Sequence, residues 1–188
     1  MHNIMNSDDK SRTIIFAFNK PKGVICSHKD ERHRSVIYDF IPSNFFREAG
    51  GTLHSIGRLD YNSQGLLLLT NNSKLKNYFE NPKSKIIRIY KVKVQGIVER
   101  KHKERILEGI TIKNIKYKVV DLRFLNKTKS YTWLRISLDS GKNQHIRKIF
   151  SKFNMTVNKL IRIQYGPYKL ANLNSGEVKI VKKKRYKY

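Results

Sequence analysis

Short runs of apolar and β-branched residues dominate the chain, and their spacing predicts strands more often than helices. Such runs cover residues 13–18, 24–27, 66–69, 86–94, 116–124, 131–138, 161–165 and 168–173. Apolar residues at helical spacing occur over residues 72–79, 99–108 and 143–153. No strand–helix–strand unit repeats along the chain. The pattern predicts an α+β fold with a mainly antiparallel, mixed sheet and flanking helices.

Local signals define the ends of two of these helices. Asn72 is a suitable N-cap for the first helix, which must end before Pro82. Gly109 is a suitable C-terminal residue for the second, charged helix. In the third, Ile146, Ile149 and Phe150 share one apolar stripe. Arg147 follows Ile146 and lies about 100° further around the helix, beside that stripe instead of opposite it.

Charge narrows the class of partner. The 188 residues include 40 Lys and Arg against 14 Asp and Glu, a formal net charge of +26. Such an excess indicates a polyanionic partner, with nucleic acid first and an anionic membrane surface second. No apolar stretch approaches the roughly 20 residues of a spanning helix. The N-terminus lacks the apolar core of a secretory signal. We therefore expect a cytoplasmic protein that does not enter the membrane.

The content of metal-ligating residues argues against a metal site. Cys26 is the only cysteine, so neither an intrachain disulfide nor a cysteine-rich zinc site is available. The six histidines show no recognisable ligand spacing. We expect a protein without a metal site.

The chain is long enough for one compact domain with its own core. We expect a disordered N-terminus over residues 1–11, one domain over residues 12–181 and a basic tail over residues 182–188. The domain is expected to consist of two closely packed halves, about 12–84 and 85–181. The tail is either a solvated surface segment or a tether for RNA.

One acidic residue stands out in this basic chain. Asp60 lies in the polar run Gly57–Gly65, directly before the apolar segment Leu66–Leu69. Aspartate commonly forms turns, because its side chain bonds to nearby backbone groups. From these residues alone, Asp60 is either a turn former or a catalytic carboxylate.

The run containing Asp60 resembles the catalytic signature of the RsuA/RluB/RluE/RluF-type rRNA pseudouridine synthases. Four further blocks are similar to motifs of that family and follow in the same order. These blocks are Phe18–Val24 (FNKPKGV), Arg88–Val92 (RIYKV), Ser140–Ile149 (SGKNQHIRKI), and Gly166-Pro167 with Leu170–Leu173 (GP and LANL). Together they extend over most of the chain, so the resemblance is more specific than any single motif.

The resemblance implies an enzyme that isomerises a specific uridine to pseudouridine in rRNA without a cofactor. It implies that Asp60 is the catalytic carboxylate and that Arg147 is the opposite charge that keeps it ionised. Tyr90 would pack its ring on the target uracil. The residues alone leave other readings open, a core aromatic for Tyr90 and a phosphate contact for Arg147.

RNA contacts follow from the same resemblance. A uridine in folded RNA must leave its stack to reach a buried carboxylate, and Arg58 would enter the vacated space or contact a phosphate. Further phosphate contacts in a central basic cleft are expected from Lys20, Lys22, Lys142 and Arg162. We expect a monomer that binds rRNA.

The first predicted strand begins close to residue 1, so we expect no N-terminal accessory RNA-binding domain. This resembles the RluE-type member, which acts on large-subunit rRNA. Gln144 and His145 replace the usual Arg-Gln pair of the family, and Ile161 stands where lysine is commoner. Two alternatives remain, a catalytically silent RNA-binding or ribosome-assembly protein and a tRNA pseudouridine synthase.

Overall fold

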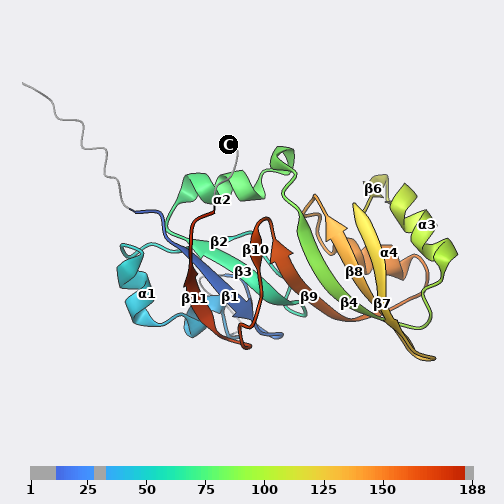
Figure 1. Cartoon of the computed structure of the whole chain (residues 1–188), viewed down its shortest axis with the longest axis horizontal. Coiled ribbons are helices and arrows are strands. Elements are labelled where there is room, and N and C mark those ends of the chain that lie inside the picture. The colour runs from blue at the N-terminus through green and yellow to red at the C-terminus, as the bar shows by residue number, and fades with distance from the viewer. Residues whose placement is uncertain (1–11, 28–32, 185–188) are drawn as a thin grey trace, which may run out of the picture.

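The computed structural model describes residues 12–27 and 33–184, so the expectation of disorder over residues 1–11 lies outside the described residues. One large sheet runs through this part of the chain, in the order β11-β1-β3-β9-β4-β8-β7 (Figure 1). Two further strands join it at the side, β10 on β9 and β2 on β3. The result is the α+β architecture predicted from the sequence, with a mostly antiparallel sheet and few helices.

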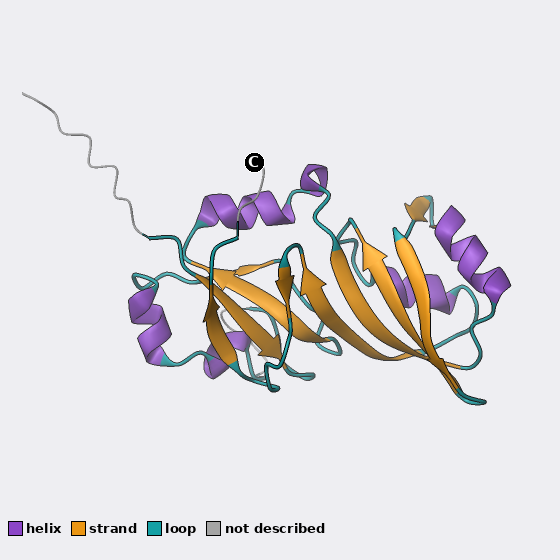
Figure 2. Cartoon of the chain, viewed as in Figure 1, coloured by secondary structure: helices purple, strands orange, loops and turns teal. Residues whose placement is uncertain are grey.

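The strands of this sheet are β1 (Ile15–Lys20), β2 (His54–Ile56), β3 (Gln64–Thr70), β4 (Arg88–Gln95), β7 (Asp121–Lys127), β8 (Tyr131–Leu138), β9 (Val157–Tyr165), β10 (Tyr168–Lys169) and β11 (Val178–Val181). A separate hairpin pairs β5 (Ile110–Ile112) with β6 (Ile115–Tyr117). The helices are α1 (Ser43–Glu48), α2 (Ser73–Glu80), α3 (Arg100–Glu108) and α4 (His145–Ser151), with 3₁₀ turns η1 (Ile37–Phe40) and η2 (Pro82–Ser84). Figure 2 shows the strands as one curved layer with the helices around it.

A short parallel contact joins the two sets of antiparallel strands. β3 meets β9 only through the pairs Gln64–Ile161 and Gly65–Arg162. The other strand pairings of the large sheet in the described part of the chain, such as β4 with β8 and β9, are antiparallel. β11 returns to pair with β1, so the second half of the chain completes the sheet of the first. The expected division at residues 84 and 85 is therefore not followed by the strand order.

Both faces of β3 are covered, which explains its continuous run of apolar residues. Leu66 and Leu68 pack in one cluster with Leu75 and Phe79 of α2. Leu67 and Leu69 pack in the larger cluster on the other face. Successive side chains of a strand point to opposite faces, so a run of leucines supplies both cores.

The other half of the sheet has a helix layer on one face. Val92 of β4 and Leu134 of β8 are fully buried in one cluster with Ile106 of α3 and Ile149 of α4. Figure 2 shows α4 behind these strands. Residues that alternate with Val92 and Leu134 point to the opposite face.

The predicted element boundaries were partly right. Residues 131–138 form β8 as predicted, and the Asn72 side chain accepts a hydrogen bond from the Leu75 amide at 2.9 Å at the start of α2. The expected strand over residues 116–124 is divided between β6 and β7. The expected strand over residues 24–27 forms only a bridge between Ile25 and Val36.

Gly65 is the point of closest approach between β3 and β9. Its φ is +103°, and a Cβ there would collide with the backbone oxygen of Arg162 and lie 2.8 Å from the backbone nitrogen of the same residue. We expect Gly65→Ala to lower the free energy of unfolding by at least about 2–3 kcal/mol, because both strain and collision arise. Urea denaturation measures this loss.

Gly141→Ala is the matched control. Gly141 has no positive φ, and nothing lies within 4 Å of the position that its Cβ would occupy. We expect its effect on unfolding to remain within about 0.5 kcal/mol. Equal unfolding midpoints for the two variants would show that the close approach of β3 and β9 does not require glycine.

Candidate active site

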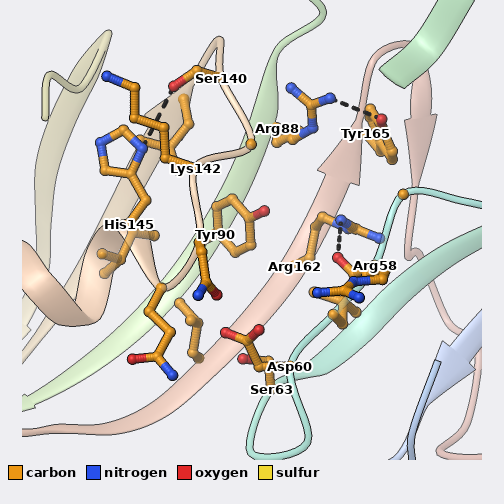
Figure 3. A pocket seen from close by; sticks show the side chains of 18 of the residues that line it. Arg58, Asp60, Ser63, Arg88, Tyr90, Ser140, Lys142, His145, Arg162 and Tyr165 are labelled. Carbon is orange, nitrogen blue, oxygen red and sulfur yellow. Dashed lines mark hydrogen bonds between the residues drawn. The ribbon is translucent and has the colours of Figure 1, made fainter. Parts of the chain in front are cut away.

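A cavity of about 500 Å³ lies where β3, β9 and β4 come together. Its walls come from the loop between β2 and β3, from β4 and β9, and from the segment between β8 and α4 (Figure 3). Lys76 and Glu80 of α2 complete the lining. Five segments that are separate in the sequence therefore contribute to one site.

Asp60 lies on the loop between β2 and β3 and is half-buried in the cavity wall. Several hydrogen bonds fix this loop on both sides of Asp60. The Gly57 amide donates to Glu80 Oε1 at 2.7 Å, and the Ser63 amide donates to the Asp60 backbone oxygen at 2.9 Å. The Leu59 amide donates to Cys26 Sγ at 3.4 Å. The carboxylate is thus held in place by its backbone.

Tyr90 presents an aromatic wall to the same cavity. It lies on β4, is 9% exposed, and pairs with Arg162 of β9. Leu138, Leu160 and Ile146 supply apolar lining beside it. Figure 3 shows the Tyr90 ring and the Arg162 side chain next to each other, on the side of the cavity that faces Asp60. A flat base would find an apolar surface within reach of a carboxylate.

Arg162 is buried in the wall of the cavity and is only 2% exposed. Its Nε donates to the Leu66 backbone oxygen at 2.7 Å, and its Nη1 donates to the Arg58 backbone oxygen at 3.4 Å. Nη2 has no hydrogen-bond partner in the part of the chain that the structure describes. The guanidinium also stacks on the Tyr165 ring, 4.9 Å from its centroid. The structure thus places Arg162, from which a phosphate contact was expected, inside the fold in the cavity wall.

Lys20 was also expected to bind phosphate, and it too is buried, with 0% exposure. It pairs with Gly65 of β3. Its Nζ donates to the Pro21 backbone oxygen at 2.8 Å. Burial lowers the pKa of Lys20 to about 8, Asp60 raises it, and Arg162 lowers it. Lys20 therefore belongs to one cluster of charged groups with Asp60 and Arg162.

Arg147 holds the loop that contains Asp60 by a main-chain oxygen of that loop. From α4, its Nη1 donates to the Val157 backbone oxygen at 2.7 Å, and its Nη2 donates to the Asn62 backbone oxygen at 3.1 Å. Among the described residues, no Lys, Arg or His nitrogen lies within 4 Å of the Asp60 carboxylate. The expected ion pair between Arg147 and Asp60 is thus not formed, and the guanidinium donates to two main-chain oxygens instead.

The remaining predicted RNA contacts are exposed. Arg58 and Lys142 line the mouth of the cavity. Lys22 is exposed but does not line it. Solvated cations at these places are accessible to the backbone of a bound RNA.

Sequence reasoning missed three polar residues of the lining. Arg88 is buried, and its Nη2 donates to the Tyr165 hydroxyl at 2.9 Å and to the Phe79 backbone oxygen at 3.1 Å. Tyr165 is fully buried between Arg88 and Arg162. His145 is 4% exposed and lies beside Ser140. Arg88 stands in the same short block as Tyr90, which was the available signal.

The described residues contain no group of three or more His, Cys, Asp or Glu that could hold a metal ion. None of their helices is long and apolar enough to cross a membrane.

The family profile described as RNA pseudouridylate synthase matches residues 14–152. A Rickettsia bellii protein described as an uncharacterized RNA pseudouridine synthase is 40% identical over 181 residues, 96% of this chain and 75% of the relative. The ribosomal large subunit pseudouridine synthase B of Buchnera aphidicola is 36% identical over 87% of this chain and 64% of its own length. The Bacillus subtilis protein of the same name is 30% identical over 91% of this chain and 69% of its own length.

Solved structures agree with the fold. A crystal structure of a pseudouridylate synthase matches with a TM-score of 0.77 and 25% identity, over 90% of this chain and 70% of that one. A structure of an H/ACA RNP bound to a substrate RNA matches with a TM-score of 0.60 and 14% identity, over 83% of this chain and 48% of that one, and shows the fold alone. With its pseudouridine synthase fold and the profile match over residues 14–152, the chain belongs to the RNA pseudouridylate synthase family and is a pseudouridine synthase.

Proposed function

We propose that this enzyme isomerises a specific uridine of large-subunit rRNA, and that Asp60 is its catalytic carboxylate. One observation carries the proposal: Asp60 is an acidic residue held in a cavity whose other charged lining residues are mostly basic. The relatives from Buchnera aphidicola and Bacillus subtilis that bear the large-subunit name support the substrate. Within the family, the sequence blocks are most similar to the RsuA/RluE-type enzymes.

The reaction requires an enclosed site. The bond between ribose C1′ and uracil N1 breaks, the base turns, and C1′ bonds to C5. The C5 proton leaves, and N1 gains a proton. A carboxylate such as Asp60 serves as nucleophile or as base, and the walls keep the detached base in position.

Arg162 fits the role of charge partner for Asp60 better than Arg147 does. Its guanidinium is fixed in the cavity wall, and its Nη2 is buried without a hydrogen-bond partner among the described residues. Burial lowers the pKa of Lys20, the charge of Asp60 raises it and that of Arg162 lowers it, as expected for charged groups of one cluster. Arg147 would instead keep the loop at the right distance from β9.

The remaining roles follow from position. The Tyr90 ring would support the flipped uracil, since it is the aromatic wall of the cavity beside Asp60. Arg58 would fill the space that the base leaves in the RNA, because it is exposed at the mouth. Lys142 would bind a neighbouring phosphate.

His145 is a neutral part of the wall. Burial lowers its pKa to about 4, with a further lowering by Lys142. Its Nδ1 lies 3.5 Å from Ser140 Oγ, and its Nε2 is buried without a partner in the described part of the chain. An uncharged imidazole adds no further positive charge to the cavity at neutral pH.

Asp60→Asn keeps the size of the side chain and removes its charge. We expect single-turnover isomerisation to fall by more than about a thousandfold, because a neutral amide is neither a nucleophile nor a base. RNA affinity should stay within about twofold, since phosphate contacts dominate it. Release of tritium from 5-tritiated uridine in an rRNA transcript measures turnover, and filter binding measures affinity.

Asp139→Asn is the matched carboxylate control, because Asp139 is half-buried beside Ser140 but does not line the cavity. Its turnover should stay within a few-fold of the parent. Near-normal turnover in Asp60→Asn would eliminate the proposed role of Asp60, whereas no turnover in the parent protein itself would favour an RNA-binding protein that performs no chemistry.

Arg162→Lys and Arg147→Lys separate the two candidate partners. Both changes keep the charge and remove the fixed fork of donors. We expect Arg162→Lys to reduce kcat by about 100-fold or more, and Arg147→Lys by about tenfold, because only Arg162 lies in the cavity wall. Single-turnover rates at saturating RNA measure both, with unfolding curves to correct for stability. A larger loss of kcat in Arg147→Lys than in Arg162→Lys would assign the role of charge partner to Arg147.

His145 makes stability depend on pH. Its folded pKa of about 4 lies below the ordinary value of 6.5, so the unfolded chain binds the proton first as pH falls. The contribution of His145 to the free energy of unfolding is therefore fully present above pH 6.5. Between about pH 6.5 and 4 it is lost, by up to about 3 kcal/mol. His145→Gln should remove this part of the loss. Urea unfolding at several pH values measures it, and parallel pH curves for both proteins would contradict the assignment.

A further inference from the structure

The sheet has a second face rich in basic and aromatic residues, on the side opposite the cavity. Tyr90 and Val92 of β4 point toward the cavity and the helices, so Lys91 and Lys93 point away from them. The same alternation places Trp133 of β8 on this outer face. Figure 2 shows the outer side of β4, β8 and β7 without a covering helix in the described part of the chain. We call the outer side of β4, β7, β8 and β9 the outer sheet face.

Like charges lie directly opposite each other on the outer sheet face. Arg123 of β7 pairs with Arg135 of β8, which pairs with Lys91 of β4. Lys93 likewise pairs with Lys159 of β9. Like charges directly opposite in a sheet are destabilising. Such an arrangement fits a surface whose charge is neutralised by a ligand.

The four strands contain a single acidic residue, Asp121. Its Oδ2 lies 2.8 Å from Arg123 Nε and 3.9 Å from Arg135 Nη1. One carboxylate therefore faces five cations, and the outer sheet face has an uncompensated positive charge. Those cations are Lys91, Lys93, Arg123, Arg135 and Lys159.

Two aromatic rings lie among these cations and are partly exposed. Lys91 Nζ lies 4.9 Å from the centroid of the Trp133 ring, and Lys93 Nζ lies 3.9 Å from that of Tyr131. Aromatic rings interleaved with lysine and arginine on an open sheet are suited to single-stranded nucleic acid, because the rings stack on bases while the cations bind phosphates.

We propose that the outer sheet face is a second RNA-binding surface, which holds a single-stranded RNA segment by stacking on Trp133 and Tyr131 and by phosphate contacts to the surrounding cations. When RNA binds, its phosphates attract the ammonium groups of Lys91 and Lys93 away from the two rings. The rings are then free to stack on bases. An acidic protein would match the charge but would offer no flat bases to the two rings. The surface is separate from the cavity, and its RNA binding does not depend on the reaction assigned to Asp60.

Trp133 is the only tryptophan of the chain, so its fluorescence reports directly on this face. The full chain is titrated with a 12-nucleotide oligoadenylate, which offers no uridine to the active site. The anisotropy of a dye on the RNA measures total binding. We expect quenching of Trp133 that saturates along the same curve as the anisotropy. A full rise in anisotropy with unchanged Trp133 emission would overturn the proposal.

Charge variants test the same surface. Lys91→Gln with Lys93→Gln removes two cations of the outer sheet face, and Lys74→Gln with Lys83→Gln removes two exposed cations elsewhere. We expect the first pair to weaken oligoadenylate binding about tenfold and to reduce the slope of log affinity against log salt by about 1.4, since each contact contributes about 0.7. The control pair should change affinity by less than about twofold. Equal losses in the two pairs would contradict the proposal.

Two further measurements separate the outcomes. Quenching in Asp60→Asn should equal that of the parent, so a failure of the proposed catalytic role leaves this result intact. Polyglutamate is the competing probe. If it quenches Trp133 and oligoadenylate does not, the face binds an acidic protein surface, and the RNA proposal is wrong.

Discussion

The close approach of β3 and β9 is the constraint on which the rest of the structure depends. Two residue pairs form this parallel contact, and one of them joins Gly65 to Arg162. The contact connects β3, which follows the Asp60 loop, to β9, which pairs with β4 and its Tyr90. A side chain at residue 65 would separate the two backbones. Lys20 pairs with Gly65 from the other side.

Buried cations surround this contact, and main-chain oxygens satisfy most of them. Arg162 donates to Leu66 and Arg58, Lys20 to Pro21, and Arg88 to Phe79. A buried charge is costly unless it is paired and hydrogen-bonded. Carbonyl oxygens fix the cations without cancelling their charge. The positive potential is therefore retained in the cavity, where it acts on the Asp60 carboxylate and on RNA phosphates.

Much of the fold followed from sequence patterns, because strand alternation and helix caps are local. The N-cap at Asn72 and the strand over residues 131–138 are examples. The helical position of Arg147 was also informative, since it lies beside the apolar stripe. Its partners could not be inferred, because they depend on where β9 and the Asp60 loop lie in space.

The two buried cations from which phosphate contacts were expected share one neighbour in the sheet. Lysine and arginine are rarely buried, so composition favours exposure for both. Lys20 and Arg162 are exceptions, and both pair with Gly65, from neighbouring strands. Resemblance to a family located Asp60 and Tyr90 through contiguous motifs. It could not show that strand pairing brings two buried cations to the same glycine.

Alternation along β4 allows the two faces of the sheet to evolve different tasks. Tyr90 points into the cavity, whereas Lys91 beside it points to the outer sheet face. Their neighbours on β8 and β9 follow the same division through the strand register. A change on the outer sheet face therefore leaves the atoms around Asp60 in place. Binding energy gathered there adds equally to the ground state and the transition state, so it affects KM and leaves kcat to the cavity.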